Sequence, residues 1–138
     1  MRLFNTNGKL VYKNVNKKKI NWLGKSRSKL QKSVKLFLKE HWENHIVYEE
    51  FPVYGTRLSV DILNATKKIA IEVNGRQHDD YVKFFHGSRN GYLQSIKRDV
   101  KKAQWLELNK FTLIEIPRED AEQLSLDYIK ETFGISIV

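Results

Sequence analysis

The sequence contains no cysteine, and this absence excludes two kinds of site. Without thiols, the chain can have neither a disulfide framework nor a thiolate zinc site. It also lacks a phosphate-cradling glycine loop and a serine-nucleophile elbow.

Long apolar runs are missing as well. The sequence has no run of roughly 18 consecutive apolar residues, and its N-terminus shows no apolar signal region. We therefore expect a soluble protein that is intracellular and cytoplasmic and has no membrane partner. The 138 residues, of which 41% are hydrophobic, suffice for one compact domain but not comfortably for two.

Acidic residues are absent from the first 35 positions, which contain eleven lysines and arginines. The rest of the chain has 14 basic and 16 acidic residues, so the N-terminal region accounts for the whole net charge of +9. Such one-sided charge predicts a polyanionic partner, because binding to phosphates releases their counterions. A solvated tail is the alternative. We interpret residues 1–25 as a basic arm or short hairpin, with "TNG" as its turn, and residues 26–138 as the main domain.

Hydrophobic periodicity predicts the element order α-β-β-β-α-β-α. Ser28 is expected to cap the first helix, and three strands should follow, with the sequences "IVYEEFPV", "RLSVDIL" and "KIAIEVN". A second helix is expected over about residues 93–109, with Val100 among its inward side chains. The strand "FTLIEI" and a helix over about residues 120–133 should close the domain. This order is typical of an α/β protein.

Two acids are expected to lie side by side in the sheet. If the turn between the second and third strands centres on residues 65–68, cross-strand partners have numbers that sum to 133, and Asp61 lies opposite Glu72. Opposed residues share a face, with Cβ atoms roughly 4.5 to 5.5 Å apart. On the other face, four apolar side chains are expected to pack against a helix: Val60, Ile62, Ile71 and Val73.

Two partly buried carboxylates at this separation repel each other, so a positive group has to compensate. Mg²⁺ does so naturally, because it binds carboxylate oxygens and retains waters for chemistry on a phosphate. A lysine or arginine from a neighbouring helix is the alternative. The sequence "GRQH" begins where the third strand ends, so Gln77 and His78 are expected to fold over the acid pair. His78 suits general acid or base catalysis, although an exposed histidine is the alternative.

Basic side chains from two regions are expected to contact a polyanion. Gln94, Arg98, Lys101 and Lys102 follow helical spacing on the second helix and would present a basic stripe toward the acid pair, unless they form a solvated face. The predicted nucleic-acid contacts are Lys17, Lys18, Lys19, Lys25, Arg27, Lys29, Arg98 and Lys102.

These residues resemble the PD-(D/E)XK nuclease superfamily, in which Asp61 would be followed after ten residues by "EVN". More narrowly, "RLSVDI", "KIAIEVNGRQH" and "RDVKKAQWLELNKFTLIEI" are similar to very-short-patch-repair endonucleases and small phage homing endonucleases. In that branch a strand ending in "DG-x-QH" leads to a helix with "RD..K" and a final hydrophobic strand. The likeness spans about residues 26–117.

The resemblance implies a restriction-endonuclease-like core, with the order α-β-β-β-α-β, a mixed central sheet flanked by helices, and a C-terminal helix. It also implies a metal-dependent phosphodiesterase with three ligands for Mg²⁺ or Mn²⁺: the carboxylates of Asp61 and Glu72 and the carbonyl of Val73.

The chain departs from the superfamily pattern at two positions. Asn74 stands where the superfamily usually has lysine, so the positioning or activation of water would pass to Gln77, His78 or a migrated lysine such as Lys102. Gln31 stands where many relatives have an acid on the first helix, and it can orient a ligand water but supplies no charge.

The expected function is hydrolysis of double-stranded DNA by an endonuclease, with a site-specific homing enzyme as one form of it. Cutting both strands would bring two active sites together in a homodimer or larger homo-oligomer. One alternative is a nuclease fold that has lost catalysis and only binds DNA, which Asn74 and Gln31 motivate. Another is an RNA-associated structural protein that uses the basic arm.

Overall fold

The computed structural model describes residues 1–75 and 89–138, with side chains for residues 1–73 and 97–138. Its main sheet has four strands in the order β3-β4-β5-β6. Strands β3, β4 and β5 are antiparallel, whereas β6 runs parallel to β5, so the sheet is mixed. The strands are β3 Val47–Pro52, β4 Ser59–Asn64, β5 Ile69–Gly75 and β6 Thr112–Pro117.

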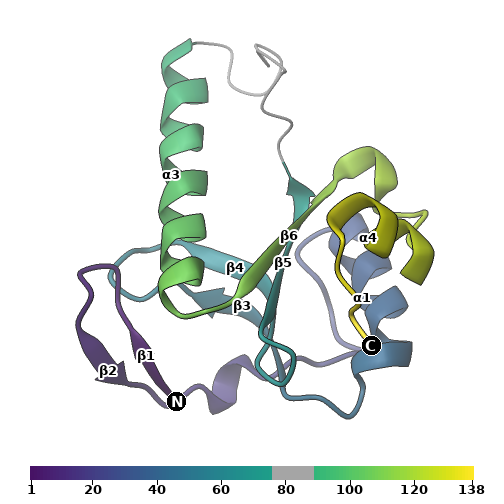
Figure 1. Cartoon of the computed structure of the whole chain (residues 1–138), viewed down its shortest axis with the longest axis horizontal. Coiled ribbons are helices and arrows are strands. Elements are labelled where there is room, and N and C mark those ends of the chain that lie inside the picture. The colour runs from purple at the N-terminus through teal and green to yellow at the C-terminus, as the bar shows by residue number, and fades with distance from the viewer. Residues whose placement is uncertain (76–88) are drawn as a thin grey trace.

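Within the described residues, three α-helices flank this sheet, with α1 and α4 on one side and α3 on the other (Figure 1). The α/β class and the predicted order of elements are confirmed. Ser28 caps α1 as expected, since its Oγ accepts the backbone N–H of Gln31 at 3.1 Å. The helices are α1 Lys29–Trp42, α3 Arg89–Leu108 and α4 Leu126–Phe133, and short 3₁₀ turns occupy η1 Asn16–Lys18 and η2 Arg118–Asp120. In the part of the chain that the structure describes, no helix combines the length and hydropathy needed to cross a membrane.

A first hydrophobic core fills the space between the sheet and helices α1 and α4. Its buried side chains come from all of these elements: Val34, Leu38, Trp42, Ile62, Ile71, Ile114, Ile116 and Ile129. The indole Nε1 of Trp42 donates to the carbonyl of Ile137 at 2.8 Å. This bond ties the C-terminal segment to α1.

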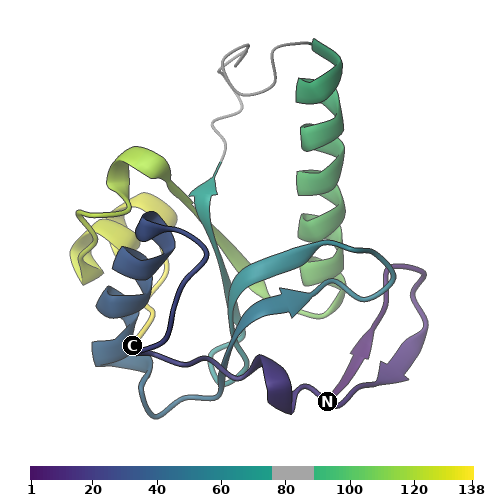
Figure 2. The same cartoon turned by 180° about the vertical axis from the view of Figure 1, so that it is seen from behind.

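A second core lies between the other face of the sheet, helix α3 and the N-terminal hairpin of β1 (Arg2–Phe4) and β2 (Leu10–Tyr12). Leu3 is buried in it with Trp105 and Leu106 of α3. The carbonyl of Phe4 accepts from the indole of Trp105 at 2.8 Å and from the amide of Asn109 at 3.1 Å. The predicted hairpin is therefore confirmed, and it packs beside the C-terminal end of α3 (Figure 2). The division into an arm and a nuclease domain stays a prediction.

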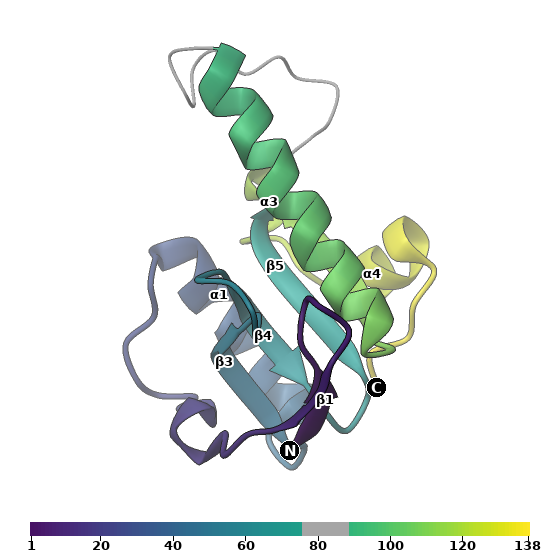
Figure 3. The ribbon, with the colours of Figure 1, turned by 90° about the vertical axis from the view of Figure 1, so that its left-hand side faces the viewer.

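Helix α3 extends beyond the sheet toward its N-terminal end (Figure 3). Trp105 and Leu106, in its C-terminal half, are buried in the second core. The expectation that Val100 faces inward is wrong, because this side chain is 46% exposed. The physical reason is that the helix has passed the edge of the second core at this position. Its exposed neighbours are cationic, as described below.

The sheet twists at the point where β3 passes Glu50, whose φ is +48°. Glu49 faces α1, where its Oε2 lies 2.7 Å from the Nζ of Lys35, but Phe51 packs in the second core. On β4, likewise, Ile62 belongs to the first core and Val60 to the second. The prediction that Val60 and Ile62 share a face is therefore wrong, because the regular alternation of side chains breaks here.

Candidate active site

Acidic residues form one row across the twisted part of the sheet. In the β4–β5 ladder, Ile62 pairs with Ile71 and partner numbers sum to 133, as predicted. Asp61 and Glu72 take the next position, immediately beyond the last ladder pair. On the outer strands, pairs on either side place Glu50 opposite Asp61, and Glu72 pairs directly with Glu115. The row thus contains one acid from each strand.

The central acids, Asp61 and Glu72, lie close enough for their carboxyl groups to share a hydrogen bond. Asp61 is only 7% exposed, and its Oδ2 accepts the backbone N–H of Val73 at 2.8 Å. Burial and the neighbouring Asp61 raise the pKa of Glu72 from about 4.5 to about 8. The pair therefore retains a proton near neutral pH.

Lys102 of α3 reaches this pair from the other side of the pocket. Its Nζ lies 2.8 Å from Oε1 of Glu72, and both side chains are largely buried. The lysine lowers the pKa of Glu72, but burial and Asp61 raise it by more, so the net shift is upward. One lysine thus compensates the acid pair only in part. The structure thus shows the alternative to a metal ion that the sequence left open, a lysine from a neighbouring helix in contact with the acid pair.

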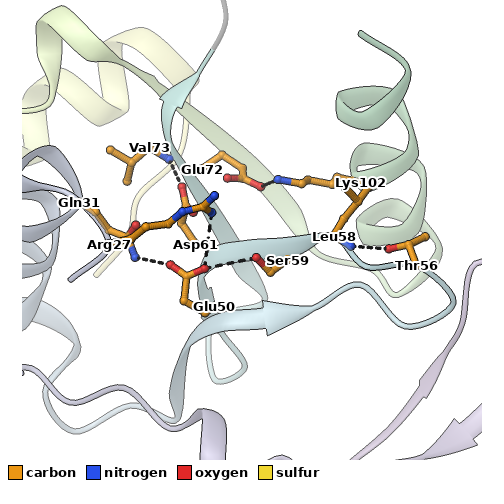
Figure 4. Close-up of polar contacts among 10 residues, drawn as sticks. All are labelled: Arg27, Gln31, Glu50, Thr56, Leu58, Ser59, Asp61, Glu72, Val73 and Lys102. Carbon is orange, nitrogen blue, oxygen red and sulfur yellow. Dashed lines mark hydrogen bonds and ion pairs between the residues drawn. The ribbon is translucent and has the colours of Figure 1, made fainter. Parts of the chain in front are cut away.

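The opposite wall is formed by the start of α1, where Gln31 is only 3% exposed. Its Nε2 donates to Oε1 of Glu50 at 3.0 Å, and the hydroxyl of Ser59 donates to Oε2 of Glu50 at 3.3 Å. The guanidinium of Arg27 lies 3.7 Å from the same carboxylate (Figure 4). Glu50 therefore holds Gln31 beside the acid pair.

Sequence reasoning missed Glu50 and Glu115 as members of this site. The signal was present, because both are acids inside apolar strands, "VYEEFP" and "TLIEIP", as Glu72 is. Glu72 was recognised because its partner lies on the adjacent strand of a tight hairpin. Placing Glu50 and Glu115 in the same row requires the register of the outer strands.

These side chains enclose a pocket of about 470 Å³ between the start of α1 and the middle of α3 (Figure 4). Its lining combines acids, bases and an amide: Arg27, Ser28, Gln31, Asp61, Glu72, Val73, Asp99, Lys102, Leu113 and Glu115. Two segments about 70 residues apart along the chain thus contribute facing walls. The sheet between them supplies the floor.

The residues of this pocket fit a divalent cation that takes few of its ligands from the protein. Within residues 1–73 and 97–138, no three His, Asp or Glu side chains converge as a metal-binding group. A cation here would find two neighbouring carboxylates among the described residues, those of Asp61 and Glu72. Mg²⁺ is commonly bound through one or two carboxylates in this way.

Some of the other residues predicted to bind DNA or take part in catalysis lie at this pocket, and others do not. Arg27 and Lys102 line the pocket, and Arg98 lines the adjoining hollow described below. Five predicted phosphate-binding residues do not line it: Lys17, Lys18, Lys19, Lys25 and Lys29. Asn74 belongs to β5, but its side chain, Gln77 and His78 lie outside the described residues.

Comparison with known proteins finds that part of this chain is similar to three viral proteins whose names state no activity. Uncharacterized protein 033L of Invertebrate iridescent virus 3 is 33% identical over 66 residues, which are 48% of this chain and 34% of that protein. Uncharacterized protein 094L of Frog virus 3 (isolate Goorha) is 37% identical over 67 residues, 48% of this chain and 43% of that protein. Uncharacterized protein 307L of Invertebrate iridescent virus 6 is 32% identical over 60 residues, 44% of this chain and 30% of that protein.

The chain thus spans less than half the length of each of these curated relatives. No family model matches the chain. No solved structure matches it either. A functional assignment therefore depends on the geometry and chemistry of the site itself.

Proposed function

We propose that the protein is a metal-dependent endonuclease that hydrolyses phosphodiester bonds of double-stranded DNA on a restriction-endonuclease-like core. The observation that carries the proposal is the buried Asp61–Glu72 pair, which lies in an open pocket with Lys102 2.8 Å from Glu72. Two acids that retain a proton at neutral pH are a costly arrangement for a purely structural site. A divalent cation would relieve that cost.

In this proposal, Asp61, Glu72 and the Val73 carbonyl hold Mg²⁺ or Mn²⁺. When bound, the ion supplies positive charge for a phosphate and lowers the pKa of a coordinated water. The Val73 N–H fixes the orientation of Asp61 through the 2.8 Å hydrogen bond. Lys102 takes the place of the lysine that Asn74 replaces, because its ammonium group can donate both to Glu72 and to a water or phosphate oxygen. Gln31 orients a water from the opposite wall.

Cleavage of supercoiled plasmid tests the activity. We expect nicking or linearisation by the wild-type protein with Mg²⁺, and none with EDTA or with the Asp61→Asn and Glu72→Gln variants. Glu131→Gln is the matched control, because it removes one exposed acid from α4, whose helix packs on the other face of the sheet. Equal cleavage by Glu72→Gln and the wild type would exclude the proposed active site.

A plasmid can lack the target sequence of a site-specific enzyme, so a second measurement is independent of cleavage. Binding of Mg²⁺ to the folded protein stabilises it by RT ln(1 + [Mg²⁺]/Kd), so its melting temperature rises with Mg²⁺ concentration. We expect this increase in the wild type and in Glu131→Gln, but not in Asp61→Asn or Glu72→Gln. Identical melting temperatures with Mg²⁺ and EDTA in the wild type would contradict a metal site.

A nuclease fold that binds DNA without cutting it is the second candidate. The contact between Lys102 and Glu72 favours it, since a lysine already supplies one positive charge to the acid pair. This candidate predicts salt-sensitive DNA binding that does not change with Mg²⁺ and no cleavage. The melting experiment separates the two candidates.

We also propose that double-strand cleavage is carried out by a homodimer or larger homo-oligomer, because one small chain presents one acid pair to one strand. Light scattering of the protein on DNA should show at least two copies. A monomer that linearises plasmid in a single binding event would contradict this.

A further inference from the structure

A second hollow, of about 270 Å³, adjoins the acid pocket. It shares Arg27, Asp99 and Lys102 with that pocket, so the two are continuous. Four of its lining side chains are cationic and one is acidic, and the full lining is Arg27, Arg57, Leu58, Ser59, Arg98, Asp99 and Lys102. Carboxylates thus outnumber cationic side chains around the acid pair, whereas the charged side chains that line the second hollow are mainly positive.

A third hollow, of about 550 Å³, adjoins the second one. It shares Leu58 and Arg98 with the second one. Its lining adds two more lysines and one apolar side chain of α3, the residues being Thr56, Leu58, Lys97, Arg98, Val100, Lys101 and Gln104. We call the second and third hollows together the basic groove. It runs from the acid pair between α3 and the β3–β4 turn.

The basic groove contains positive charge that the described part of the protein does not neutralise. Arg57 and Arg98 are exposed, and neither has an ion-pair partner among the described residues. Arg27 has one in Glu50, but at 3.7 Å and with the guanidinium largely exposed, this contact is weak. Arg57 and Arg98, which have no ion-pair partner among the described residues, are suited to bidentate recognition of phosphate.

The turn that carries Arg57 is held in place by the N-terminal hairpin. The hydroxyl of Thr56 donates to the Val53 carbonyl at 2.8 Å and accepts the N–H of Leu58 at 3.0 Å. The backbone N–H of Thr6 donates to the Tyr54 carbonyl at 2.9 Å. Arg57 therefore projects from a braced turn, which limits the conformational entropy lost when it binds a ligand.

We propose that the basic groove binds the DNA backbone on one side of the cleaved phosphodiester, with Arg57 and Arg98 as its main phosphate contacts. The identity of the polyanion rests on the proposed function, whereas the existence of an anion-binding groove does not. The strand would leave the acid pair across α3, beside the β3–β4 turn, and Leu58 and Val100 would lie against its sugars. Arg57 was not among the nucleic-acid contacts predicted from the sequence.

Fluorescence anisotropy of a labelled duplex of about 30 base pairs tests this proposal in EDTA, where no cleavage interferes. Arg57→Gln and Arg98→Gln should each weaken binding several-fold and reduce the slope of log affinity against log salt by about 1. The double variant should reduce the slope by about 2. Lys130→Gln, which removes one exposed charge from α4, should leave affinity and slope unchanged.

The other possible outcomes decide between parts of the proposal. A double variant that binds like the wild type, or a wild type that does not bind duplex DNA, overturns the groove. Preferential binding of RNA of the same length, lost in the double variant, overturns DNA as the ligand. If binding depends on Arg57 and Arg98 but plasmid is never cut, the groove stands and the nuclease proposal fails.

Arg57→Lys is the control for misfolding. It keeps the charge and should restore the salt slope, which excludes misfolding as the cause of weaker binding.

Discussion

Lys102 of α3 donates to Glu72 of β5 across 2.8 Å, and this contact joins a helix to the acid pair that the hairpin creates. Replacement of the lysine by methionine keeps its length but removes the ammonium group. We expect Lys102→Met to lower the cleavage rate by about 100-fold or more, the size typical of losing a group that handles protons or charge in the transition state.

Lys102→Arg keeps the charge but not the compact ammonium group, so we expect it to recover only part of that loss. Initial rates on plasmid at saturating protein measure both variants. A Lys102→Met protein that cuts at the wild-type rate would show that the lysine only neutralises Glu72.

The stability of the metal-free protein should depend on pH through Glu72. Its pKa is raised to about 8 by burial and by Asp61, so the folded state binds its proton more tightly than the unfolded state does. The resulting stabilisation is fully present below pH 4.5 and is lost as pH rises toward about 8. The wild type should therefore lose stability relative to Glu72→Gln over this range, by at most about 1.4 kcal/mol per pH unit.

Urea unfolding of both proteins in EDTA, at several pH values within that range, measures this difference. Asp61→Asn provides a second check, because removing the neighbouring charge should flatten the pH dependence. Parallel stability curves for the wild type and Glu72→Gln would contradict a raised pKa.

Alanine substitutions at two glycines with positive φ separate two contributions to the loss of stability, backbone strain and steric overlap of the new Cβ with a neighbour. Gly8 has φ +80° and open space where a Cβ would lie, whereas a Cβ on Gly55, at φ +101°, would overlap the Thr6 side chain and lie 3.1 Å from the Thr6 backbone nitrogen. We expect Gly8→Ala to reduce the free energy of unfolding by about 1 kcal/mol and Gly55→Ala by about 2 to 3 kcal/mol.

Only Gly55→Ala should also weaken DNA binding, because Thr6 braces the turn that carries Arg57. Urea unfolding and the anisotropy assay measure the two effects. Equal losses of stability for both variants would mean that the hairpin shifts to accommodate the added methyl group at no further cost in free energy.

Two buried tryptophans donate to backbone carbonyls. Among the described residues, only one of these carbonyls accepts a second hydrogen bond. Trp42 donates to Ile137, whereas Phe4 accepts from both Trp105 and Asn109. Trp→Phe at either position removes a similar volume, so the difference should reflect the hydrogen bond. We expect Trp42→Phe to be more destabilising than Trp105→Phe by about 1 to 2 kcal/mol.

Adding Asn109→Ala to Trp105→Phe should remove the second donor and introduce a coupling energy between the two substitutions. Thermal or urea unfolding of the four proteins measures it. Strict additivity would show that Asn109 does not compensate for the lost indole.

Local pattern in the sequence was enough for the order of elements, the Ser28 cap and the β4–β5 register. These features depend on neighbours along the chain: apolar periodicity sets which face of a helix or strand is buried, and a short turn sets the pairing of the strands that flank it. Because Asp61 and Glu72 flank such a turn, their opposition followed from the sequence alone.

Tertiary structure alone decided what surrounds that pair. The break in side-chain alternation at Glu50 moved Val60 to the second core, and the length of α3 beyond the sheet exposed Val100. The contact of Lys102 with Glu72 and the approach of Arg57 to Arg98 join segments 30 or more residues apart. Their positions depend on how two cores pack and how far the sheet twists, which no local pattern in the chain encodes.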